Sequence, residues 1–204
     1  MKTIVINAGP KRKDINAKLA QSALKGAESV GADVKYIDLY KLDLHGCMTC
    51  LICKREGMEG KCNWRDDVSP LIEEILDSDC LLIAAPIFFS APTSHYQALI
   101  ERLIYCLVSY QTGNSFDGRV NVGLFYTINY PKKYFEDSVR PHLKQSEDIL
   151  KMLNGRVEIH SFENISQRNY SDTSEKGLEI LKSKEEQFVL DLDEAFEIGA
   201  DLSQ

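Results

Sequence analysis

Short apolar runs alternate with amphipathic stretches along the whole chain. Five of these runs are rich in β-branched or aromatic residues, which predicts strands at residues 2–7, 33–38, 80–85, 119–126 and 156–161. Elsewhere apolar residues recur at spacings of three and four, which predicts helices at residues 16–30, 67–77, 93–109, 134–153 and 176–200. Strands that alternate with helices predict a doubly wound α/β fold, in which ligands bind at the carboxyl ends of parallel strands.

The run that ends at Pro86 is apolar from Cys80 onward, as expected of a central parallel strand covered on both faces. We expect it to lie next to the strand at residues 2–7. The chain has no internal repeat, low-complexity tract or Pro/Ser linker, so a single domain over residues 1–204 is expected. Residues 39–66 form an unusually long connection, and it carries four cysteines.

The first predicted strand ends in the turn Asn7-Ala8-Gly9-Pro10, and three basic residues, Lys11 to Lys13, follow it. A helical pattern begins near Asn16. A strand, a tight turn and a helix start bring free backbone N–H groups and the positive end of the helix dipole to one point. Such a point binds phosphate, although a plain turn followed by a solvated charge run explains the same pattern.

Charge and cysteine content narrow the choice of partners. The net charge is −7, and the basic residues form no extended stripe, so nucleic acid is not expected as a partner. No signal segment and no apolar run of membrane-spanning length is present, so we expect a cytoplasmic protein without a membrane partner. Six cysteines in such a chain indicate free thiols, metal binding or redox chemistry rather than a disulfide framework.

Three segments at the ends of predicted strands carry a family resemblance. They are the turn Asn7 to Lys11, the cysteine segment Gly46 to Cys62 and the stretch Ala85 to Ser90, with added support from Tyr126 to Pro131. Together they make the chain resemble the NAD(P)H-dependent FMN reductase family of the flavodoxin-like fold, including its iron-sulfur flavoprotein branch. The resemblance implies an α/β three-layer sandwich whose five-stranded parallel sheet has the order 2-1-3-4-5.

The same resemblance implies a flavin-dependent oxidoreductase. Hydride would pass from NAD(P)H to FMN, and electrons would go on to a quinone, a flavin or another small-molecule electron acceptor. The first loop would hold the FMN phosphate, and the segment after the third strand would line the flavin ring. The cofactor-binding residues implied in this way are Gly9, Pro10, Lys11, Asn16, Pro86, Ile87, Phe88, Phe89, Ser90, Thr127 and Asn129. A homodimer or homotetramer is implied too, because family members usually complete the flavin pocket across a subunit interface.

The phosphate loop departs from the family pattern at two positions. Gly9 and Ala17 stand where members usually carry hydroxyls, so two phosphate donors are missing. Their loss would weaken FMN binding by about 10²- to 10⁴-fold unless Lys11 and Arg12 compensate. Two other functions remain open. One is a non-enzymatic flavin or iron-sulfur electron carrier, which the cysteine segment and the acidic surface would suit, and the other is a degenerate binding module that no longer retains flavin.

Four cysteines form a separate candidate site. Cys47, Cys50 and Cys53 follow one another at spacings of three, and Cys62 comes nine residues later. Two consecutive Cys-x-x-Cys steps suit a four-iron four-sulfur cluster, although the gap before Cys62 is longer than is usual in the iron-sulfur flavoprotein branch. The sequence favours reduced, unliganded thiols over the cluster, and zinc is a third possibility.

Three further residues have ordinary structural explanations. Cys80 and Cys106 lie in apolar runs and are predicted to be core residues. His95 is predicted at the start of a helix, where it would lie on the helix surface or touch a nicotinamide or substrate.

Overall fold

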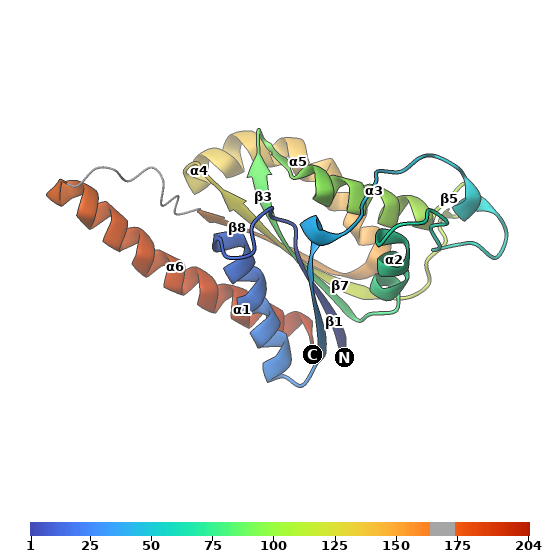
Figure 1. The fold of residues 1–204 in the computed structure, drawn as a ribbon, viewed down its shortest axis with the longest axis horizontal. Helices are drawn as coiled ribbons and strands as arrows, with labels where there is room; N and C mark the ends of the chain where they lie inside the picture. The colour runs from blue at the N-terminus through green and yellow to red at the C-terminus, as the bar shows by residue number, and fades with distance from the viewer. Residues whose placement is uncertain (164–173) are drawn as a thin grey trace.

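In the computed structural model of the chain, residues 1–163 and 174–204 are described. The apolar runs form one main sheet (Figure 1). Its parallel strands are β1 (Lys2–Asn7), β2 (Asp33–Asp38), β3 (Cys80–Phe88), β7 (Val120–Ile128) and β8 (Asn154–Glu163). They lie in the order β2-β1-β3-β7-β8, which confirms the predicted order. The predicted five-stranded parallel sheet is confirmed as well, and the two-residue strand β4 (Ala91–Pro92) adds an antiparallel pair to β3.

Helices cover both faces of this sheet and make three layers (Figure 1). The helices on one face are α1 (Ile15–Ser29) and α6 (Glu175–Leu202). Those on the other face are α2 (Val68–Leu76), α3 (Ser94–Leu107) and α5 (Arg140–Asp148). Side chains of β3 alternate between the two cores: Leu82 packs toward α1 and α6, and Ile83 packs toward α2 and α3. Burial on both faces explains why this strand reads as a continuous apolar run.

The predicted helix at residues 134–153 is divided into four pieces. They are α4 (Lys132–Tyr134), a π-helical turn (Phe135–Val139), α5 and a 3-10 turn (Ile149–Leu153). Pro141 lies in the first turn of α5 and has no N–H to donate to the preceding turn, so the backbone there widens. The predicted helix at residues 93–109 is also too long, because α3 ends at Leu107 and a hairpin of β5 (Val108–Ser109) and β6 (Gly113–Asn114) follows.

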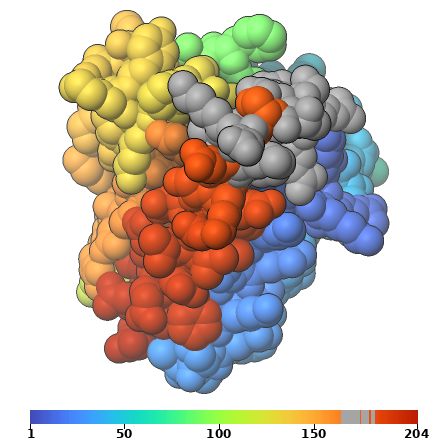
Figure 2. Space-filling model, turned by 90° about the vertical axis from the view of Figure 1, so that its left-hand side faces the viewer, coloured from blue at the N-terminus to red at the C-terminus, as the bar shows by residue number. Residues whose placement is uncertain are grey.

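The last helix packs closely against the first (Figure 2). Ala195, Ile198 and Leu202 are buried there with Leu19 and Ala23 of α1. The apolar face of the last helix therefore covers α1 and also packs against β7. Among the described residues, no helix combines the length and apolar character needed to cross a lipid bilayer.

Candidate flavin and cysteine sites

A buried hydrogen-bond network ties together the carboxyl ends of three strands. The Asn16 amide donates to Asn7 Oδ1 (2.6 Å) and to the Ala84 carbonyl (2.9 Å), and the Thr127 hydroxyl donates to Asn16 Oδ1 (3.3 Å). Asn16 and Thr127 are 2% and 3% exposed. Both were predicted to bind FMN, and both already hold β1, β3 and β7 in register. Their direct contact with a flavin stays a prediction.

Gly9 lies in a tight place within this network. Its N–H donates to Asn7 Oδ1 (3.0 Å), and a Cβ at Gly9 would lie 3.0 Å from Asn16 Nδ2 and 3.1 Å from Asn7 Oδ1. Those distances are shorter than ordinary contacts of a Cβ atom. The missing side chain at this position is therefore explained by packing, and a serine here would press on the Asn7–Asn16 pair.

The basic residues after the turn are exposed, and they differ in their partners. Arg12 Nε lies 3.6 Å from Asp38 Oδ2, and Lys41 Nζ lies 2.6 Å from the same oxygen. Burial opposes ionisation of Asp38, but hydrogen bonds from Lys41 and Asn7 outweigh it and lower the Asp38 pKa. Among the described residues, Lys11 has no ion-pair partner. Lys13 has none there either, so both lysines of this loop are available to a phosphate.

The segment after Ala85 is a hairpin and not the loop that the sequence predicted. Pro86 to Phe88 continue β3, and only Phe89 and Ser90 form the turn before β4. Both turn residues have positive φ, 51° and 64°, which is unfavourable for residues other than glycine. The turn leaves the Phe89 ring fully exposed at the carboxyl edge of the sheet. Strain of this kind concentrates at functional sites.

The remaining predicted contacts lie at the same edge. Asn129 is exposed in the bend that follows β7. His95, in the first turn of α3, stacks on Tyr40 with ring centroids 3.7 Å apart. Burial lowers the His95 pKa. Tyr40 was not singled out from the sequence, since only the fold brings the end of β2 next to the start of α3.

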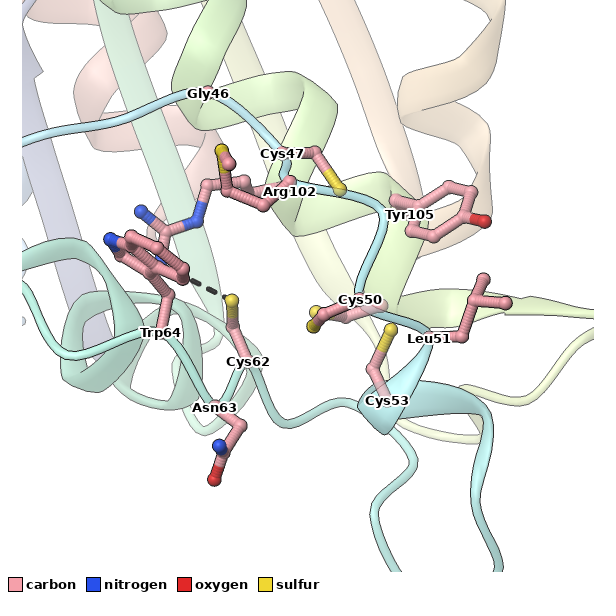
Figure 3. A pocket seen from close by; sticks show the side chains of 12 residues that line it. Gly46, Cys47, Cys50, Leu51, Cys53, Cys62, Asn63, Trp64, Arg102 and Tyr105 are labelled. Carbon is pink, nitrogen blue, oxygen red and sulfur yellow. Dashed lines mark hydrogen bonds between the residues drawn. The ribbon is translucent and has the colours of Figure 1, made fainter.

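The four motif cysteines line one pocket, together with Trp64 and Tyr105 (Figure 3). Cys53 is buried in it and Cys50 is exposed. The backbone is left-handed on both sides of Cys50, with φ of 51° at Thr49 and 59° at Leu51. A β-branched residue with positive φ is a true outlier, so the segment is held in a strained course around the pocket. Within the described part of the chain, no three His, Cys, Asp or Glu side chains converge as ligands of a single metal ion.

Arg102 of α3 lines this pocket, and its hydrogen bonds hold the surrounding segments together. Its side chain is 1% exposed and pairs through both Nη atoms with Asp66, whose side chain is fully buried. The guanidinium also donates to Cys62 Sγ (3.2 Å) and to the His45 carbonyl (3.2 Å). Burial opposes ionisation of Cys62, but bonds from the Trp64 backbone and from Arg102 lower the pKa of this thiol. Sequence reasoning missed Arg102, because nothing local marks it.

The two remaining cysteines divide between core and pocket. Cys80 is fully buried in β3, and burial raises the pKa of its thiol to about 12, as expected of a core residue. Cys106 is also buried, yet it lines the cysteine pocket beside Cys53. The prediction of a plain core role is therefore incomplete for Cys106. Its position four residues after Arg102 on α3 is the signal that links it to the site.

A doubly wound parallel sheet in the order β2-β1-β3-β7-β8, with helices on both faces, places the protein in the flavodoxin-like class of folds. The sequence profile of the NADPH-dependent FMN reductase family matches residues 1–153. The chain therefore belongs to the NADPH-dependent FMN reductase family, whose members are flavin-dependent oxidoreductases that use FMN. The predicted resemblance is confirmed.

Curated relatives include iron-sulfur flavoproteins of two archaea. One from Methanocaldococcus jannaschii is 28% identical over 123 residues, covering 60% of this chain and 62% of the relative. One from Archaeoglobus fulgidus is 26% identical over 104 residues, covering 51% of this chain and 46% of the relative. The matches thus span about half to three fifths of these relatives' lengths.

Solved structures share the fold over essentially the full chain. An NAD(P)H:quinone oxidoreductase from Methanothermobacter marburgensis superposes with a TM-score of 0.75 at 14% identity, covering 100% of this chain and 98% of that one. An FMN-dependent NADH-azoreductase from Bacillus anthracis in complex with FMN gives 0.67 at 15% identity, with both chains fully covered. At such identities the likeness establishes the flavodoxin-like fold.

Proposed function

We propose that the protein transfers hydride from NAD(P)H to FMN and passes the electrons to a small acceptor such as a quinone or an azo compound. Membership of the FMN reductase family carries this proposal. The acceptor classes come from the named activities of proteins with the same fold. A homodimer or homotetramer and a cytoplasmic location remain predictions.

The residues at the carboxyl edge fit a flavin in their chemistry. On the phosphate side Lys11 is exposed and the backbone turns tightly at Gly9, so a cation and the start of α1 lie together. On the ring side Phe89 is fully exposed at a strained turn, and an aromatic face of this kind buries a flavin ring. When bound there, FMN supplies the hydride acceptor and the electron store of the reaction.

The protein contributes position and exclusion of water in this scheme. The Asn7–Asn16–Thr127 network fixes the floor of the site, so the ring meets a rigid edge rather than mobile side chains. The β3–β4 hairpin supplies an apolar wall at Phe88 and Phe89, both of which are exposed without a ligand. Covering these rings on ligand binding removes apolar surface from water and favours the bound state.

We expect NADPH or NADH to bleach the visible absorbance of the FMN-loaded protein when they are mixed without air in a stopped-flow instrument. A hydride donor must stack over the flavin, so bleaching should saturate with donor concentration. Dithionite serves as the control, since it reduces any accessible flavin. Bleaching by dithionite but by neither nucleotide would assign the protein to the electron carriers instead.

We also propose that Cys47, Cys50, Cys53 and Cys62 hold a four-iron four-sulfur cluster. Three observations favour it over unliganded thiols: all four line one pocket, the backbone is strained on both sides of Cys50, and curated relatives are named iron-sulfur flavoproteins. Four thiolates at the corners of a cluster stand further apart than ligands of one ion, which agrees with a pocket in which no single-ion site forms. When bound, a cluster supplies one-electron transfer.

Anaerobic reconstitution with iron and sulfide should load about four irons per chain. Cys62→Ser should lower this content sharply, because the fourth corner then lacks its thiolate. Cys106→Ser is the matched control: Cys106 lines the same pocket but lies outside the motif, so its iron content should stay unchanged. If wild-type protein binds FMN but takes up no iron, the thiols are unliganded and the cluster proposal fails.

A further inference from the structure

The N-terminus of α1 already carries an anion that belongs to the protein. Asp14 is the N-cap of this helix, and its Oδ1 accepts a hydrogen bond from the Ala17 N–H at 3.0 Å. The first N–H groups of a helix have no partner within the helix, and together with the helix dipole they attract negative charge. These are the groups that a phosphate at this loop would use. The Asp14 carboxylate therefore occupies the preferred position for an anion.

The surroundings leave the Asp14 charge uncompensated by any direct pair. Arg12 pairs with Asp38, which also holds Lys41. Within the described ranges, Asp14 itself has no ion-pair partner, and its side chain is only partly buried. A phosphate entering the loop must displace this carboxylate from the Ala17 N–H or lie beside it at like charge. Both routes oppose the binding of a phosphate, and neither affects a flavin that lacks one.

We propose that Asp14 is a specificity-determining residue of the flavin site and lowers the preference for FMN over riboflavin. This inference rests on the proposed flavin function of the same loop. Asp14 is a second reason for weak phosphate binding, beside the absence of hydroxyls at Gly9 and Ala17. The loop lacks these phosphate donors, and it also presents a carboxylate at the start of α1. The protein therefore recognises a flavin chiefly through its ring system and only weakly through its phosphate.

Packing singles out Asp14 as the position to change. A serine at Gly9 would bring its Cβ within 3.0 Å of Asn16 Nδ2 and disturb the network beneath the site, so a change there confounds charge with structure. Asn is as good an N-cap as Asp. Asp14→Asn therefore keeps the cap on Ala17 and removes only the charge. Asp14→Ser keeps a capping oxygen, removes the charge and adds a hydroxyl that can donate to phosphate.

The test compares FMN and riboflavin binding by quenching of flavin fluorescence in wild type, Asp14→Asn and Asp14→Ser. We expect both variants to bind FMN about tenfold more tightly, since the loss of an anion at a helix N-terminus and of a neighbouring like charge together contribute on that scale. Riboflavin affinity should stay within about twofold. Lys11→Ala removes a cation instead of an anion, so it should weaken FMN binding and leave riboflavin binding unchanged.

Each result has a definite meaning. An unchanged ratio of FMN to riboflavin affinity in Asp14→Asn overturns the inference, and so does an equal gain for both flavins, because a phosphate effect cannot act on riboflavin. Failure of both flavins to bind folded wild type and both variants overturns the proposed flavin function itself. Melting temperatures without ligand establish that each variant is folded, and they should agree because the cap is retained.

Discussion

Replacing Arg102 with leucine is expected to lower the free energy of unfolding by about 3–5 kcal/mol. The substitution leaves the fully buried Asp66 carboxylate without its cation, and removing one partner of a buried ion pair is far more costly than never having built the pair. It also removes the bonds to Ser69 (2.8 Å), Cys62 and the His45 carbonyl. Urea unfolding followed by circular dichroism measures the change.

Asp66 provides the matched variants for this measurement. Its Oδ1 also accepts from the N–H groups of Val68 and Ser69 at the start of α2, so Asp66→Asn keeps a capping oxygen and removes only the charge. The double variant Arg102→Leu with Asp66→Asn should be more stable than Arg102→Leu alone, since no buried charge remains unpaired. A loss below about 1 kcal/mol in Arg102→Leu would show that the pair is solvated in solution.

The Asp66 pKa sets the pH range over which the Arg102–Asp66 ion pair stabilises the protein. Burial raises the Asp66 pKa, but the bonds from Arg102 outweigh burial, and the net folded-state pKa is below its ordinary value of 3.8. A carboxyl whose pKa falls on folding stabilises the protein above its unfolded-state pKa, and this contribution disappears as the pH falls through the lower folded-state pKa. The difference between wild type and Arg102→Leu should therefore be largest at neutral pH. It should shrink as the pH falls through the acid range, because Asp66 without Arg102 takes up its proton at a higher pH than in wild type.

The sequence predicted the framework well because local pattern and tertiary structure agree there. β1 and β2 have the predicted limits, 2–7 and 33–38, since β1 is a β-branched run and β2 carries apolar residues at Val34, Tyr36 and Ile37. β3 runs three residues past its predicted end. Pro86 looked like a stop, but the strand continues through it and returns as a hairpin whose Phe-Ser turn lacks the usual glycine or asparagine. Only the pairing with β4 reveals this.

The candidate sites were predicted only as far as their residues lie on one loop or motif. The first turn and the cysteine spacing are visible along the chain, but Asp66 and Arg102 are 36 residues apart and meet through the packing of α2 on α3. Asn16 shows that a residue on such a loop can also have a role that the local sequence does not reveal. Its place after the turn suggested a ligand contact, and the structure uses its amide to join strand ends far apart in the sequence, which no local pattern encodes.

Gly199→Ala is expected to destabilise the protein by about 3 kcal/mol, although an alanine in an ordinary exposed helix position is about 1 kcal/mol better than glycine. A Cβ at Gly199 would lie 2.1 Å from the carbonyl oxygen of Ala23, and a Cβ at Gly26 would lie 1.9 Å from that of Phe196. These neighbours are backbone atoms within helices, so α1 and α6 must move apart before either side chain fits.

Glu197→Ala is the matched control, because Glu197 is exposed on the same helix two residues earlier, and its replacement should change the stability little. Urea unfolding compares the variants, and a neutral or stabilising Gly199→Ala would show that α6 does not pack on α1 this closely. The flavin site should respond as well. The loop at Gly9 leads directly into α1, so a displaced α1 carries its N-terminal N–H groups away from the edge of β1 and β3. FMN binding to Gly199→Ala should therefore weaken together with its stability, whereas Glu197→Ala should bind FMN as wild type does.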